Sequence, residues 1–187
     1  VIATRQGRGT YILDATPLSE EIIDANRIPN FTRDMAEMGR EPSSRVLSIR
    51  ETSPRDEPQA ASELKLHARE RLVRIERVRL ADGKPLCVQT CFFPRSRVEG
   101  IVERGLRDGE SLTSVLQGEY GITIAVARQT ISATAATDCD ARELQITPGA
   151  PMLLVERTSF LSTSEPVEFL VDRRVPDFSF MVWLRRK

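Results

Sequence analysis

Apolar and polar residues alternate along residues 72–94, and this alternation predicts two antiparallel strands. The stretch reads LVRIERVRLADGKPLCVQTCFFP, and the Asp82-Gly83 pair in its middle is typical of a tight turn between strands. Every second residue of a strand points to the same side of the sheet. One face of the first strand is therefore formed by Val73, Ile75, Arg77 and Arg79.

This face changes from apolar to cationic at Arg77 without a change of phase. If the face looks into the protein, Arg77 and Arg79 need partners, because a buried charge without a partner is costly. A guanidinium keeps its charge at neutral pH and can bind a phosphate or carboxylate through two parallel N–H groups. The partner is either a bound anion or a carboxylate of the protein such as Glu76, and the pattern leaves both open.

Similar patterns divide the rest of the chain into short elements. Helices are predicted over 19–26, 59–66 and a solvated stretch at 95–106. A further helix runs from Asn30 or Thr32 as N-cap to Gly39, and another from Glu110 to Gly118 or Gly121. The last predicted helix covers 138–144, with Asp138 or Asp140 as N-cap. Strands are predicted over 44–52 and 122–134 and in a second hairpin at 152–160 and 167–175.

The two hairpins share a sequence pattern. LVRIERVRLADGKPLCV and LLVERTSFLSTSEPVEF both contain an apolar lead-in, a Glu-Arg pair (Glu76-Arg77 and Glu156-Arg157), a turn, and Pro followed by an apolar residue. This echo suggests a pseudo-symmetric antiparallel sheet, although convergence on common hairpin residues would give the same pattern. In such a sheet, a binding site could form between the two halves.

Composition limits the kind of protein. The 187 residues suffice for one domain, or for one domain and part of another. Lys+Arg and Asp+Glu balance at 27 each, so any contact with DNA must be local. No apolar run approaches the ~20 residues needed to cross a bilayer, and no secretory signal pattern is visible. We therefore expect a cytoplasmic protein with no membrane partner.

Residues that commonly hold metals or attack substrates are few. The three cysteines, Cys87, Cys91 and Cys139, lack CxxC spacing, and His67 is the only histidine. No nucleophile motif, phosphate-binding P-loop or dinucleotide fingerprint occurs. We expect reduced thiols, no metal centre, no cofactor and no catalytic residues.

The chain begins VIATRQGRGTYIL, which reads as two short strands around a glycine-rich turn. Its cationic tip could contact DNA phosphates, although a solvated basic turn fits the same residues: Arg5, Gly7, Arg8 and Gly9. RQGRGTYI closely resembles the wing at the end of the winged-helix domain of GntR-type bacterial transcription regulators. The resemblance implies that DNA is bound through an N-terminal winged-helix domain missing from this chain, which we expect to be a fragment.

A broader resemblance covers most of the remaining residues. It rests on R-x-R before a DG turn, a Ser-Leu helix start, PG-x-P, ER-x-S/T and P-V-E, in that order. These motifs resemble the UTRA domain, the effector-binding module of the HutC-type branch of GntR regulators. The resemblance implies an α+β fold, namely an antiparallel β-sheet flanked by helices and similar to chorismate lyase, and a homodimer. It divides the chain into a wing remnant at 1–13, a linker at 14–29, and an effector-binding and oligomerisation domain at 30–187.

The resemblance also implies a set of effector-binding residues. In the family, the R-x-R arginines contact an anionic effector, and the Ser of the Ser-Leu start and a Phe-Thr pair approach it. Carried onto this sequence, the set is Arg77, Arg79, Ser111, Phe31 and Thr32, with Thr113 where the family often has an aromatic residue. Ser111 and Thr32 can also serve as helix N-caps, and a helix N-terminus itself attracts anions.

Two further positions set the polarity of the expected pocket. Glu168 accepts hydrogen bonds from effector hydroxyl or amino groups if the family pattern holds, and is otherwise an exposed strand carboxylate. The family's glutamate in the first hairpin is Gln89 here, which argues against an amine-bearing effector such as an amino sugar phosphate. Three other arginines could add charge to the pocket or remain paired at the surface: Arg128, Arg173 and Arg174.

Two functions follow from these features. The first is a ligand-responsive transcription regulator, in which a small anionic metabolite (a sugar phosphate or a phosphonate-like compound) reorients the DNA-binding domains of a dimer. The alternative is a chorismate lyase-like enzyme that acts on an aromatic carboxylate. The wing-like segment favours the regulator, because a stand-alone enzyme has no use for it.

Overall fold

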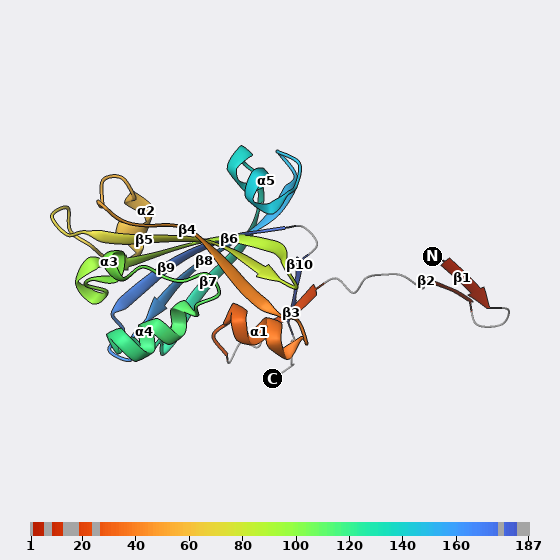
Figure 1. Cartoon of the computed structure of the whole chain (residues 1–187), viewed down its shortest axis with the longest axis horizontal. Coiled ribbons are helices and arrows are strands. Elements are labelled where there is room, and N and C mark those ends of the chain that lie inside the picture. Colours follow the sequence, from red (N-terminus) through yellow and green to blue (C-terminus); the bar gives the residue numbers. More distant parts are fainter. Residues whose placement is uncertain (1, 6–8, 13–18, 24–26, 176–177, 183–187) are drawn as a thin grey trace, which may run out of the picture.

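A six-stranded antiparallel sheet forms the centre of the computed structural model (Figure 1). The structure describes residues 2–5, 9–12, 19–23, 27–175 and 178–182, with side chains described over 27–175. In spatial order the strands are β4 (Pro42–Thr52), β5 (Leu72–Ala81), β6 (Lys84–Pro94), β9 (Pro166–Arg174), β8 (Pro151–Phe160) and β7 (Val126–Ala135). The predicted α+β fold with an antiparallel sheet is confirmed.

The sheet consists of two halves with matching strand order. Strands β4, β5 and β6 form one half and β7, β8 and β9 the other, and β6 pairs with β9 at the centre. Helix α2 (Pro58–Glu63) follows the first strand of one half, and α5 (Asp138–Leu144) follows the first strand of the other. The pseudo-symmetry suggested by the two hairpins is therefore present, and Arg77 and Arg157 lie on equivalent strands.

The first hairpin folds as its sequence predicts. It turns at Asp82, with φ of 53°, and Gly83, with φ of 73°, which are the positive angles that a two-residue hairpin turn favours. The four residues of the alternating face are at most 4% exposed: Val73, Ile75, Arg77 and Arg79. The cationic half of this face is thus buried.

Helices cover both faces of the sheet (Figure 1). Helices α1 (Phe31–Glu37) and α4 (Leu112–Tyr120) lie on the face that carries the two arginines, and α2 and α5 lie on the opposite face. The stretch predicted as one solvated helix forms two short turns, η1 (Arg95–Arg97) and α3 (Ile101–Arg104), separated by Gly100 with φ of 81°. That prediction was partly wrong, because Val98 and Ile101 are fully buried in the core beside α4.

Two local predictions need correction. The expected helix over 19–26 begins instead as strand β3 (Ser19–Ile23), which pairs in parallel with β10 (Phe178–Val182), so a distant partner overrides the local pattern. Helix α5 is capped by Thr137 rather than by Asp138 or Asp140. The Thr137 hydroxyl accepts from the Asp140 backbone N–H while the Asp140 carboxylate accepts from the Thr137 N–H, a reciprocal capping box.

The predicted ribbon at the start of the chain is present as β1 (Ile2–Arg5) and β2 (Gly9–Ile12), with Arg5 opposite Gly9. Gly7 and Arg8 lie outside the described residues, and the DNA-contacting role of this ribbon remains a prediction. Within the described parts of the chain, no helix combines the length and apolar character needed to span a membrane.

Candidate anion-binding pocket

A pocket of about 190 Å³ lies between the arginine-bearing face of the sheet, the start of α1 and the start of α4. Strand residues form its floor: Arg77, Arg79, Gln89, Cys91, Arg157, Glu168 and Leu170. Residues before and within the two helices, together with two isoleucines, form its walls: Ile28, Pro29, Asn30, Phe31, Thr32, Arg33, Ser111, Leu112, Thr113, Leu116, Gln117, Ile122 and Ile124. All eight residues predicted to bind an effector line this one pocket, although their role in binding remains a prediction.

Arg77 is the least satisfied cation of the floor. It is 3% exposed, and its Nη2 donates a hydrogen bond of 2.5 Å to Oε1 of Gln89, which lies opposite it on β6. Its Nε and Nη1 are buried and have no hydrogen-bond partner among the described residues. Burying a charged donor without a partner is unfavourable, so these two N–H groups are available for an acceptor that enters the pocket.

Arg79 is held by the start of α1. Its guanidinium carbon lies 4.4 Å from the centroid of the Phe31 ring, and its Nη2 donates to Oγ1 of Thr32 at 2.9 Å. Its Nε is buried and likewise unpartnered in the described part of the chain. Burial, together with the neighbouring Arg77 charge, lowers the pKa of Arg79 to about 10, so this side chain is still protonated at neutral pH.

The carboxylates on this face of the sheet have other partners. Glu168 accepts a hydrogen bond of 2.8 Å from Ser159, and Asp172 accepts one of 2.8 Å from Arg174. Glu76, the candidate partner from sequence, lies on the opposite face of β5 and accepts from Arg74 at 2.6 Å and from Ser48 at 2.9 Å. Because none of these acids accepts a hydrogen bond from Arg77 or Arg79, the pocket floor keeps an excess of positive charge.

Arg157 is a pocket residue that sequence reasoning did not select. Its Nη1 donates to the Pro29 carbonyl oxygen at 2.9 Å, and its Nη2 lies 3.9 Å from Oε2 of Glu168. The signal that could have found it is the Glu-Arg echo, which aligns Arg157 with Arg77. The echo thus relates two arginines that both line the pocket, Arg77 and Arg157.

Helix caps bring polar side chains to the pocket walls. Asn30 caps α1 by accepting from the Arg33 N–H at 3.1 Å, so the alternative cap, Thr32, is wrong. Ser111 caps α4 by accepting from the Ser114 N–H at 3.3 Å. The Asn30 amide also donates to Oγ1 of Thr113 at 3.2 Å, which joins the starts of the two helices.

The other candidate groups lie apart from the pocket lining or lack reactivity. The three additional arginines are paired with acids, Arg128 with Glu63, Arg173 with Asp140, and Arg174 with Asp172. Cys91 does line the pocket, but burial raises the pKa of its thiol, which is therefore neutral and a poor nucleophile. His67 is exposed, and the described residues contain no cluster of three or more His, Cys, Asp or Glu able to hold a metal ion.

The fold and pocket are typical of small-ligand-binding domains: polar groups of an antiparallel sheet converge on a pocket between the sheet and two helices. The chain belongs to the UTRA domain family, whose model matches residues 37–177.

Individual relatives agree with this assignment. The chain is 32% identical over 189 residues to the HTH-type transcriptional regulator Rv0792c of Mycobacterium tuberculosis, covering 99% of this chain and 66% of that protein. This chain thus spans about two thirds of the length of that relative. The name of this relative supports the predicted link to transcription regulators and does not favour the lyase alternative.

Solved structures share the fold. PhnF from Mycobacterium smegmatis matches with a TM-score of 0.78 at 19% identity, covering 100% of this chain and 79% of PhnF. The ligand-binding domain of a putative GntR-family transcriptional regulator from Bordetella bronchiseptica matches with a TM-score of 0.69 at 24% identity, covering 78% of this chain and 90% of that domain. The predicted UTRA fold of GntR-type regulators is therefore confirmed.

Proposed function

We propose that this chain is the effector-binding domain of a GntR-type transcription regulator of the HutC branch. Its pocket binds a small anionic metabolite, a sugar phosphate or a phosphonate-like compound. Occupancy of the pocket changes how a winged-helix domain, N-terminal to this chain in the whole cytoplasmic protein, binds DNA. This coupling requires that the effector have different affinities for the two arrangements of the regulator.

The observation that supports an anion is the set of buried N–H groups without acceptors. Arg77 contributes Nε and Nη1, and Arg79 contributes Nε, all counted among the described residues. A phosphate or phosphonate group brings both negative charge and several acceptor oxygens, which match a fork of guanidinium donors. An entering anion thus removes the cost of burying these groups.

The remaining polar groups narrow the ligand class. Oε1 of Gln89 is engaged by Arg77, which leaves its Nε2 as a donor toward the ligand. Glu168, which is 5% exposed, is the carboxylate that lines the pocket. This arrangement suits a compound with an acceptor-rich anionic head and a hydroxyl group that donates to Glu168.

We also propose that the regulator is a homodimer joined through β7. This strand is an outer edge of the sheet, and it carries the two large hydrophobic residues that are exposed in the described part of the chain, Val126 at 62% and Ile131 at 40%. An unpaired edge strand is a template for pairing with another chain. Antiparallel pairing of β7 with β7 of a second copy would give hydrogen-bond partners to the backbone N–H and C=O groups along this edge.

Thermal-shift screening of phosphorylated, phosphonate and carboxylate metabolites tests the effector site. An anion of the right class should raise the melting temperature of the parent and of Arg142→Ala, a matched variant whose arginine is 71% exposed and paired with Glu143. Arg77→Ala should lose the response while keeping the folded circular dichroism spectrum. The lost charge-assisted hydrogen bonds correspond to an affinity decrease of about tenfold to 100-fold. A parent that responds to no anion, or an equal response of Arg77→Ala, would show the site assignment to be wrong.

A further inference from the structure

Residues 27–37, which we call the entry segment, form one unit organised around the Asp34 carboxylate. Asp34 accepts from the backbone N–H of Asn30 at 2.6 Å and from the side chains of Arg27 and Arg33 at 2.6 and 3.2 Å. Arg33 also donates to the Ile28 carbonyl oxygen at 2.9 Å. These contacts fold the stretch before α1 onto the helix itself.

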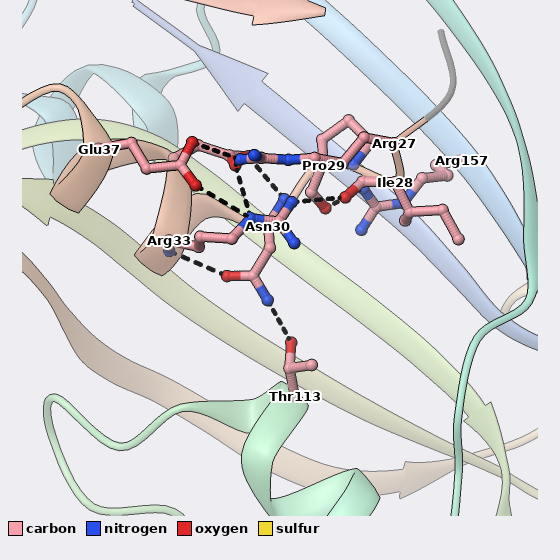
Figure 2. Close-up of polar contacts among 9 residues, drawn as sticks. Arg27, Ile28, Pro29, Asn30, Arg33, Glu37, Thr113 and Arg157 are labelled. Atoms are coloured by element: carbon pink, nitrogen blue, oxygen red, sulfur yellow. Dashed lines mark hydrogen bonds and ion pairs between the residues drawn. The ribbon is translucent and has the colours of Figure 1, made fainter. Parts of the chain in front are cut away.

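The entry segment is held to the rest of the domain by residues of the pocket. Within the described residues, three side-chain hydrogen bonds cross between them: Asn30 to Thr113 at 3.2 Å, Arg79 to Thr32 at 2.9 Å, and Arg157 to Pro29 at 2.9 Å. All three partners outside the segment line the pocket. Figure 2 shows two of these partners, Thr113 and Arg157, approaching the segment from α4 and from the sheet. A ligand in the pocket therefore meets the same groups that hold the segment.

We propose that Arg157 is a latch for the entry segment, and that an anionic effector opens this latch by taking the guanidinium from the Pro29 carbonyl. The proposal rests on the proposed function, because it requires an anion in the pocket. Arg157 becomes in this way a further effector-binding residue. When the Arg157 guanidinium leaves the Pro29 carbonyl, the entry segment is held less firmly. Because this segment joins the sheet to the N-terminal part of the chain, ligand binding in the pocket then affects that part.

The geometry makes Arg157 the contact most easily exchanged. Its partner on the segment is a neutral carbonyl, and hydrogen bonds between an ionised donor and an ionised acceptor are stronger than those to a neutral acceptor. Glu168 attracts the guanidinium as an ion pair but makes no hydrogen bond to it, since the 3.9 Å separation exceeds hydrogen-bond distance. Arg79, by contrast, is fixed by the Phe31 ring as well as by Thr32.

Hydrogen exchange read by mass spectrometry tests the latch with inorganic phosphate as the probe. The parent, Arg157→Gln and Arg142→Gln are compared over the amides of residues 28–33, with and without phosphate. Without phosphate, Arg157→Gln should exchange roughly tenfold faster than the parent, the factor expected for one hydrogen bond from a charged group. Arg142→Gln, which removes an exposed arginine of α5 outside the pocket, should match the parent. Phosphate should speed exchange in the parent and have little further effect in Arg157→Gln.

The outcomes separate the latch from the anion site. Equal exchange in Arg157→Gln and the parent without phosphate overturns the latch. Phosphate that raises the melting temperature of the parent but leaves exchange unchanged, or slows it, overturns the competition while the anion site stands. If phosphate does not bind the parent, the idea that this anion opens the latch is refuted. The comparison of Arg157→Gln with the parent in the absence of phosphate still decides whether Arg157 holds the entry segment. Should Arg157→Gln not fold, the effect of phosphate on the parent decides the proposal.

Discussion

Arg77 and Gln89 face each other across β5 and β6, and the guanidinium donates to the amide oxygen over 2.5 Å in the buried floor of the pocket. The amide satisfies one N–H group without neutralising the charge. A carboxylate at the same position would do both. The identity of residue 89 therefore decides how much positive charge remains for a ligand.

Gln89→Glu should convert this contact into an ion pair and weaken anion binding by about tenfold or more, because the new charge repels the ligand and competes for Arg77. Titration calorimetry with the anion found by screening, or with inorganic phosphate, measures the change. Gln145→Glu is the matched control, since it adds the same charge at an exposed position after α5. Unchanged affinity in Gln89→Glu would place the anion away from Arg77.

The pH range of binding follows from Arg79 and from the ligand. The pKa of Arg79 is lowered to about 10, first by burial and then by the charge of Arg77, so its proton is lost as the pH rises through about 10. A phosphate monoester gains its second negative charge near pH ~6. Affinity for such a compound should rise through about pH 6, stay level, and fall as the pH passes about 10.

Sulfate provides the control for this profile, because its charge is constant across the neutral range. Its affinity should show only the alkaline decrease. Calorimetric titrations at successive pH values measure both curves. If the affinity for the phosphate monoester does not increase near pH ~6, preferential binding of its dianion is contradicted.

Ser111 combines a structural role with a place in the pocket, and two substitutions separate them. Ser111→Ala removes the acceptor for the Ser114 N–H and should lower the free energy of unfolding by about 0.5–2 kcal/mol, with a smaller effect on anion affinity. Ser111→Asp keeps a capping oxygen but adds negative charge, so it should remain stable and bind the anion at least about tenfold more weakly. Urea unfolding and calorimetry give the two quantities.

Thr137→Ala is the remote control, because Thr137 caps α5 outside the pocket lining. It should lose stability as Ser111→Ala does and bind the anion like the parent. Normal anion binding by Ser111→Asp would mean that the ligand does not approach the start of α4.

Much of the pocket could be predicted because its signals are local. The period of two along β5 places Arg77 and Arg79 on the face of Val73 and Ile75, and burial of that face follows from its apolar half. The Asp82-Gly83 pair fixes the hairpin in a two-residue turn. The family pattern then gathered residues from five separate elements (α1, β5, β6, α4 and β9), which local periodicity could not do.

The missed features depend on partners distant in sequence. Nothing near Pro29 indicates that its carbonyl accepts from Arg157, which is 128 residues away. Likewise, β3 is a strand because β10 lies beside it, and its own sequence is compatible with a helix. The entry segment thus depends on tertiary contacts that a single sequence does not reveal.

The outer strand β7 leads to a prediction about assembly. It pairs with β8 along ten residues without a register shift, and it contains neither proline nor a bulge to block pairing on its free side. Ile131 is a central position of this strand and is 40% exposed. Light scattering coupled to size-exclusion chromatography should show a dimer for the parent.

Ile131→Lys should shift this dimer toward monomer, with affinity between copies reduced by about tenfold or more, because lysine on an edge strand opposes pairing with another strand. Ser62→Lys adds the same charge at an exposed position of α2 and should leave the dimer intact. A dimeric Ile131→Lys would move the interface elsewhere, and a monomeric parent would refute pairing through β7. Because β7 belongs to the same half-sheet as Arg157, a dimer formed here would place one latch on each side of the β7–β7 seam, within one continuous sheet.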